Sequence, residues 1–151
     1  MENSLNIAEC FDNLASSFRG KTAIITGGGS GIGQTVAHFL AGGGANVFSM
    51  DLDHRSATSD CLESGRLRLI TGSVCDEAEC ERTVQEAVSR TGRLDILVNC
   101  AGIVERTVKT IRQDSATWQK TIDVNLGGTY RMSKAAAVAM VELRNGAQLS
   151  M

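Results

Sequence analysis

Short apolar runs typical of β-strands alternate with stretches of helical periodicity from Gly20 onward. Four runs predict strands, at residues 21–26, 45–50, 66–70 and 94–98. The stretches between them predict helices at residues 31–41, 55–64 (weakly) and 76–92. Asp76 and Gly92 are typical of the two ends of a helix. The near-continuous apolar run at 94–98 is typical of a strand covered on both faces. This alternation predicts a Rossmann-like α/β fold with a doubly wound parallel sheet.

A long helix is predicted to follow, from Asp114 or Ser115 to about Leu143, and residues 147–151 resemble the opening of a fifth strand. We therefore expect an incomplete fold, with strands 1–4 and the start of strand 5 in a truncated domain at residues 20–151. Residues 1–19 form an N-terminal arm in this interpretation. Its apolar residues recur at helical spacing, at Ile7, Phe11, Leu14 and Phe18. Packing of the arm on its own domain is favoured, while a partner-contacting or frayed arm stays open.

Composition excludes several classes of protein. The chain has 151 residues, 42% of them hydrophobic, and a net charge of -2, which disfavours intrinsic disorder. No apolar run approaches the roughly 18–20 residues of a membrane span, and a pI near 5.7 disfavours nucleic-acid partners. The first residues lack the pattern of a signal peptide. Five cysteines without a Cys-x-x-Cys pair favour reduced thiols over a metal site or disulfide framework, so we expect a cytoplasmic protein.

A glycine-rich turn separates the first predicted strand from the helix behind it. It reads Thr26-Gly-Gly-Gly-Ser-Gly-Ile-Gly33, which is T-G-x-x-x-G-x-G and neither G-x-G-x-x-G nor a Walker loop. Such a turn lets the backbone approach a pyrophosphate, and the free N–H groups at the helix start face the anion. A turn of this kind alone can also be a packing device.

Asp51 ends the second strand 18 residues after Gly33, near the spacing of an acidic residue that accepts hydrogen bonds from the adenosine ribose. A carboxylate there repels a 2′-phosphate. Ser30 and Leu52 stand where a phosphate-binding cation would be needed, and Arg55 is a distant candidate. NAD is therefore favoured over NADP as cofactor, although Asp51 as a solvated turn residue remains the alternative.

The chain resembles the short-chain dehydrogenase/reductase family. Besides the glycine turn, it has Asn99-Cys-Ala-Gly102 where the family has N-N-A-G, then Trp118 and Asp123-Val-Asn125-Leu-Gly-Gly-Thr129. The resemblance implies that the pyrophosphate binds Gly27, Ser30, Gly31, Ile32 and Gly33, and the ribose binds Asp51. It implies further that Ser73 and Val74 flank the adenine, and that Asn99, Ala101 and Gly102 lie by the nicotinamide-side ribose, with Thr26 tied to Asn99. Ser73 replaces the family's usual Asp, and Cys100 an Asn.

The resemblance also implies hydride transfer between NAD and a small-molecule alcohol or ketone. The family's catalytic Ser and Tyr-x-x-x-Lys follow the fifth strand, beyond the last residue of this sequence. Asn125 matches the family's catalytic Asn, which anchors a water between the Lys and solvent. Tyr130 and Lys134 match Tyr-x-x-x-Lys literally, but they share a helix with Asn125, so we interpret Tyr130 as filling space within the fold or at a subunit contact. The catalytic interpretation is the alternative.

Three functions stay open at this stage. In the first, the chain is the cofactor part of an NAD-dependent oxidoreductase. In the second, it is a module that binds NAD, or pairs with longer subunits, without catalysis. In the third, it is an unstable fragment. We expect a homo-oligomer formed through the long helix.

Overall fold

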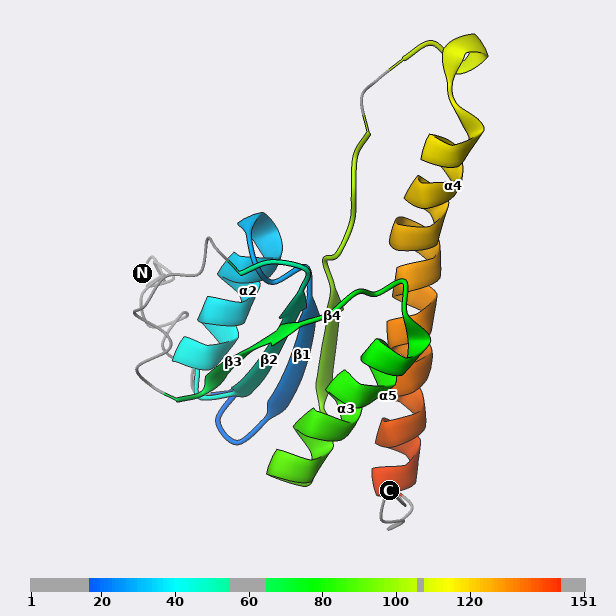
Figure 1. Cartoon of the computed structure of the whole chain (residues 1–151). Coiled ribbons are helices and arrows are strands. Elements are labelled where there is room, and N and C mark those ends of the chain that lie inside the picture. The colour runs from blue at the N-terminus through cyan, green and yellow to red at the C-terminus, as the bar shows by residue number, and fades with distance from the viewer. Residues whose placement is uncertain (1–16, 55–64, 106–107, 145–151) are drawn as a thin grey trace, which may run out of the picture.

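The computed structural model describes residues 17–54, 65–105 and 108–144, and its centre is a parallel four-stranded sheet (Figure 1). The strands are β1 (Thr22–Thr26), β2 (Asn46–Asp51), β3 (Leu67–Thr71) and β4 (Ile96–Asn99), in the order β3-β2-β1-β4. All three pairings are parallel. The four predicted strands and the Rossmann-like fold are therefore confirmed, and this order is half of a doubly wound sheet.

Helices cover both faces of the sheet (Figure 1). Helix α2 (Gly31–Gly42) packs on one face, with Ala23 and Ile25 of β1 in its core cluster. Helices α3 (Glu77–Thr91) and α5 (Thr129–Arg144) pack on the other face, where Ile24 belongs to the second cluster. Strand β1 is fully buried, since both faces of the sheet are covered. Successive side chains of a strand point to opposite faces, so β1 contributes residues to both cores.

Helix α3 has the two ends that its sequence predicts. The Asp76 carboxylate accepts hydrogen bonds from the N–H groups of Ala78 and Glu79, at 2.9 and 3.2 Å, and Gly92 ends the helix at φ 70°. The Glu79 carboxylate does not close a capping box on Asp76, because it accepts a hydrogen bond from the Ser73 N–H instead.

The predicted long helix is continuous and has three parts: α4 (Ser115–Ile122), the π-helical segment η3 (Asp123–Gly128) and α5. A separate 3-10 turn, η2 (Thr110–Arg112), precedes α4. Helix α4 has no buried residue and extends past the end of the sheet (Figure 1). No described helix is long and apolar enough to cross a bilayer.

Strand β4 is covered on both faces, as predicted, but only in part. Leu97 packs against the core cluster of α3 and α5, Ile96 and Val98 pack against that of α2, and all three are only half-buried. The strand begins two residues later than predicted, and β1 is its only partner among the described strands. Phe18, at the end of the expected arm, packs edge-on against Phe39 of α2 with 5.8 Å between ring centroids. The rest of the arm up to residue 16, the weak helix at 55–64 and the fifth strand at 147–151 lie outside the described residues.

Candidate functional site

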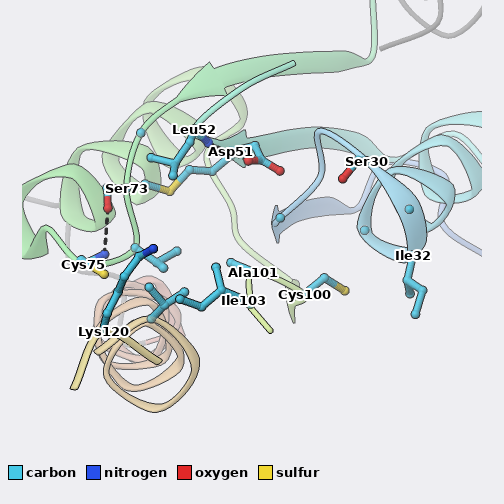
Figure 2. Close-up of a pocket in the computed structure, with 18 residues that line it drawn as sticks. Ser30, Ile32, Asp51, Leu52, Ser73, Cys75, Cys100, Ala101, Ile103 and Lys120 are labelled. Carbon is cyan, nitrogen blue, oxygen red and sulfur yellow. Dashed lines mark hydrogen bonds between the residues drawn. The ribbon is translucent and has the colours of Figure 1, made fainter. Parts of the chain in front are cut away.

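A cleft of about 490 Å³ lies at the carboxyl ends of the strands, where doubly wound sheets bind their ligands (Figure 2). It holds ten of the eleven residues expected to bind cofactor: Gly27, Ser30, Gly31, Ile32, Gly33, Asp51, Ser73, Val74, Ala101 and Gly102. Of the remaining lining residues, Leu52 and Cys100 were considered from the sequence as positions near the cofactor, and the others were not singled out: Met50, Gly72, Cys75, Ile103, Lys120 and Val124. The fold thus brings residues from four strand ends and the long helix to one cleft.

The glycine-rich turn packs backbone against backbone. A Cβ on Gly27, whose φ is +69°, would lie 2.6 Å from the backbone of Cys100 and Ala101. A Cβ on Gly33 would lie 2.2 Å from the Gly27 carbonyl oxygen. Thr26 pairs with Asn99 in the register of β1 and β4, as expected, and its hydroxyl also accepts a hydrogen bond from the Ala101 N–H at 3.2 Å. The start of α2 is therefore held close to the ends of β1 and β4.

The first turn of α2 has no side-chain cap. Ser30 is the N-cap residue in extended conformation, yet its hydroxyl makes no capping hydrogen bond, and the first turn contains no acidic residue. The Ser30 side chain is exposed and lines the cleft. Because the N–H groups of a first helical turn lack intrahelical partners and carry the positive end of the dipole, this end of α2 is suited to an anion.

The Asp51 carboxylate is fixed beside the turn by backbone N–H groups. Its Oδ2 accepts a hydrogen bond from Gly29 at 2.8 Å, and its Oδ1 accepts one from Leu52 at 2.7 Å. A carboxylate has about four lone-pair sites, so capacity remains for further donors such as ribose hydroxyls. The negative charge also disfavours a phosphate group at this place.

The far end of the cleft lies between β3 and the long helix. The Ser73 hydroxyl accepts a hydrogen bond from the Cys75 N–H at 3.2 Å, and Val74 beside it is 6% exposed. Lys120 of α4 lies next to Cys75 in Figure 2, and its ammonium donates to the Glu105 carboxylate at 3.0 Å. Sequence reasoning missed Lys120 because only the tertiary position of α4 brings it to the ends of the strands.

Two predicted site residues lie outside the lining of the cleft. The Asn99 amide donates to the Ser133 hydroxyl of α5 at 3.0 Å. The Asn125 amide accepts from the Ile103 N–H at 2.8 Å and donates to the Ile103 carbonyl at 3.0 Å. Asn125 thus satisfies both backbone groups of Ile103 and holds the segment after β4 against η3. Its role as a water anchor stays a prediction.

The Tyr-x-x-x-Lys match lies away from the cleft. Tyr130 is 65% exposed, so it does not fill space within the described fold as one interpretation expected. The Lys134 ammonium donates to the Glu77 carboxylate of α3 at 2.7 Å. This ion pair raises the pKa of Lys134 and lowers the pKa of Glu77. Neither Tyr130 nor Lys134 lines the cleft.

A family model described as short chain dehydrogenase matches residues 21–149. The chain belongs to the short-chain dehydrogenase family. Members of this family are NAD(P)-dependent oxidoreductases.

Relatives of this short-chain dehydrogenase chain share about a third of its residues. An uncharacterized oxidoreductase of Bacillus subtilis, YhdF, is 36% identical over 140 residues, which are 89% of this chain and 48% of that protein. The 3-oxoacyl-(acyl-carrier-protein) reductase FabG of Escherichia coli is 35% identical over 132 residues, covering 86% of this chain and 53% of its own. The chain spans about half the length of the curated relatives that it matches.

Solved structures of the family have the same fold. A short-chain type dehydrogenase/reductase from Mycobacterium ulcerans matches with a TM-score of 0.78 at 34% identity, over 85% of this chain and 49% of that one. Carveol dehydrogenase from Mycobacterium avium, solved in complex with NAD, matches with a TM-score of 0.76 at 26% identity, over 82% and 50%.

Proposed function

We propose that this chain is the NAD-binding part of an oxidoreductase that transfers a hydride between NAD and an alcohol or ketone. The nicotinamide ring supplies the hydride chemistry, and the described residues supply a site for the dinucleotide. The observation that carries the proposal is the shared cleft of the uncapped start of α2 and the Asp51 carboxylate. One suits a pyrophosphate and the other suits a ribose diol. The NAD complex of the related carveol dehydrogenase supports it.

In this proposal the pyrophosphate would bind the turn from Gly27 to Gly33, because five of its seven residues are glycines and leave the backbone open to an anion. Asp51 accepts hydrogen bonds from the ribose hydroxyls. Ser73 and Val74 flank the adenine, and Asn99, Ala101 and Gly102 lie on the nicotinamide side. Asn125 positions the segment around Ile103 that borders this side.

NAD is favoured over NADP by charge. Asp51 would lie close to a 2′-phosphate and repel it. Among the described residues that line the cleft, Lys120 is the one Lys or Arg, and its ammonium is already paired with Glu105. Arg55, the distant cation considered from the sequence, lies outside the described residues.

The chain by itself is proposed to hold cofactor without full catalysis. Tyr130 is the single tyrosine of the sequence, and it is absent from the cleft lining. Hydride transfer to a ketone needs a proton donor at the substrate oxygen, which is the role of a tyrosine in this family. The described lining of the cleft thus offers groups for cofactor binding and no tyrosine, which supports the proposal.

Two measurements on the 151-residue chain test this proposal. Titration with NADH, followed by nicotinamide fluorescence, should show saturable binding. Incubation of the same sample with NAD and a panel of secondary alcohols should produce no NADH above background. A chain that does not bind NADH lacks the proposed function, and a chain that reduces NAD has a proton carrier that the proposal omits.

A second proposed function is subunit pairing through the long helix. Trp118, Leu126 and Tyr130 lie at multiples of four residues along it and are 59%, 65% and 65% exposed. Large exposed apolar side chains on one element are typical of an interface. We expect the wild-type chain to sediment as a dimer or larger oligomer and Trp118→Glu to reduce its mass. Val104→Glu is the matched control, because Val104 is 95% exposed but lies outside the helix. A monomeric wild-type chain would exclude pairing.

A further inference from the structure

Gly128, the last residue of η3, lies against Val74 at the far end of the cleft. A Cβ on Gly128 would be 2.5 Å from Val74 Cγ2 and 2.9 Å from Val74 Cβ, which real Cβ atoms do not tolerate. Gly128 is itself buried. The neighbouring Gly127 differs, because its Cβ would meet only the end of the flexible Arg131 side chain, at 2.8 Å. One of two adjacent glycines is therefore in tight contact with a residue of the cleft.

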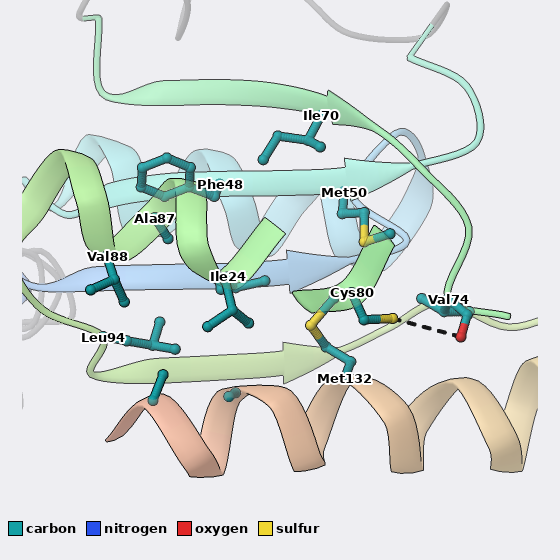
Figure 3. Packing of buried hydrophobic residues seen from close by; sticks show 13 residues of the cluster. Ile24, Phe48, Met50, Ile70, Val74, Cys80, Ala87, Val88, Leu94 and Met132 are labelled. Carbon is teal, nitrogen blue, oxygen red and sulfur yellow. Dashed lines mark hydrogen bonds between the residues drawn. The ribbon is translucent and has the colours of Figure 1, made fainter. Parts of the chain in front are cut away.

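Val74 is also held from its other side. The Cys80 thiol of α3 lies 3.7 Å from the Val74 carbonyl oxygen and donates to it (Figure 3). Val74 belongs to the same buried cluster as Met132 of α5 and is 6% exposed, although it also lines the cleft. Val74 is thus packed against α3 and the long helix, and the open direction left to it is toward the cleft that it lines.

We propose that Gly128 is a positioning residue that sets the depth of Val74 in the cleft and thereby the fit of the adenine ring. This inference rests on the proposed NAD-binding function. The missing side chain at Gly128 lets the long helix closely approach Val74 in the segment that follows β3. A methyl group there pushes Val74 toward the cleft or moves the helix away from it. Either displacement changes the surface on which the adenine lies. Wider π-helical turns are frequent at functional sites, which fits this location.

The test compares Gly128→Ala with Gly127→Ala, which makes the same chemical change one residue earlier in the same π-helical segment. We expect Gly128→Ala to weaken NADH binding by at least about fivefold, the scale of an overpacked core position. ADP-ribose, which keeps the adenine, should lose the same factor. Reduced nicotinamide mononucleotide, which lacks the adenine, should bind as it does to wild type. Gly127→Ala should stay within about twofold for all three.

A second substitution that restores binding would separate the positioning role of Gly128 from a general loss of folding. Val74→Ala removes Cγ2, the atom nearest to the added methyl, so Gly128→Ala with Val74→Ala should bind NADH better than Gly128→Ala alone. Should Gly128→Ala fail to fold, the double variant is expected to fold, because the 2.5 Å collision with Cγ2 is removed and the 2.9 Å approach to Val74 Cβ is the tightest contact left. Circular dichroism and thermal melts of all four proteins measure this.

The outcomes distinguish the two claims. Absence of NADH binding by the wild-type chain overturns the proposed function itself. Wild-type binding with equal affinities for Gly128→Ala and Gly127→Ala overturns the positioning role alone. So does a loss that is equal for reduced nicotinamide mononucleotide and ADP-ribose, or a double variant no better than Gly128→Ala.

Discussion

Replacing Gly33 with alanine tests whether the backbone packing of the glycine-rich turn creates the site. A Cβ at this position lies 2.2 Å from the Gly27 carbonyl oxygen and 2.8 Å from its carbon. Ordinary contact begins near 3.4 Å. The start of α2 must therefore move by roughly 1 Å relative to the end of β1, since neither backbone atom belongs to a flexible side chain.

The magnitude follows from two opposing effects on stability and one on binding. Overpacking costs about 1–3 kcal/mol, while alanine in place of glycine within a helix stabilises by about 1 kcal/mol. The chain should therefore lose at most about 2 kcal/mol of stability and remain folded. A shift of roughly 1 Å breaks N–H···O hydrogen bonds to the pyrophosphate, and each lost bond to a charged group is worth about 1.5–3 kcal/mol. NADH binding should weaken by about tenfold to a hundredfold.

Gly42→Ala is the control for this prediction. Gly42 ends the same helix, and a Cβ there meets nothing within 4 Å. It shares the gain in helix propensity and has no collision, so its NADH affinity should equal that of wild type. Fluorescence titration gives the affinities, and thermal melting shows whether each variant is folded. A folded Gly33→Ala chain that binds NADH as tightly as Gly42→Ala would refute the reasoning.

Three further predictions concern residues outside this turn. Asp76→Ala should lower the melting temperature by about 3 °C, because the N-cap of α3 is worth about 1 kcal/mol, whereas Asp76→Asn keeps the acceptor and should not; equal melts of the two variants would count against the cap. Burial raises the pKa of Cys80 from its ordinary 9.0 to about 11. Below pH 9 the thiol is therefore neutral in both the folded and the unfolded chain, and between pH 9 and 11 it ionises in the unfolded chain but stays neutral in the folded one. The stability advantage of wild type over Cys80→Ala should therefore narrow between pH 9 and 11 in melts across that range, and a constant difference would contradict this. Tyr130→Phe should leave NADH affinity unchanged within about twofold, and a large loss in titration would assign the tyrosine a cofactor role.

The strands and the helix ends could be predicted from the sequence because each depends on residues that are close together in the chain. The strands ending at Thr26 and Asp51 follow from apolar runs, and the ends of α3 follow from Asp76 and Gly92. The burial of β4 was predicted only in part, since an apolar run indicates that both faces are covered but does not show whether a neighbouring strand is present.

The site was predictable in part for the same reason. The turn and Asp51 occupy strand ends, where chain order alone decides position. Lys120 lines the cleft and Gly128 contacts Val74 through the packing of the long helix, which no spacing in the sequence records. Thr26 was expected to be tied to Asn99, and the two residues are partners in the strand register. The hydrogen bond from the Ala101 N–H to the Thr26 hydroxyl was not predicted.

The central claim is that the start of α2 and Asp51 form one site for NAD. It is tested most directly by titrating the 151-residue chain with NADH and with NADPH under the same conditions. The account predicts saturable binding of NADH and an affinity for NADPH at least about tenfold weaker, because Asp51 repels the 2′-phosphate. Equal or tighter binding of NADPH would contradict the role of Asp51, and no saturable binding of either would contradict the site.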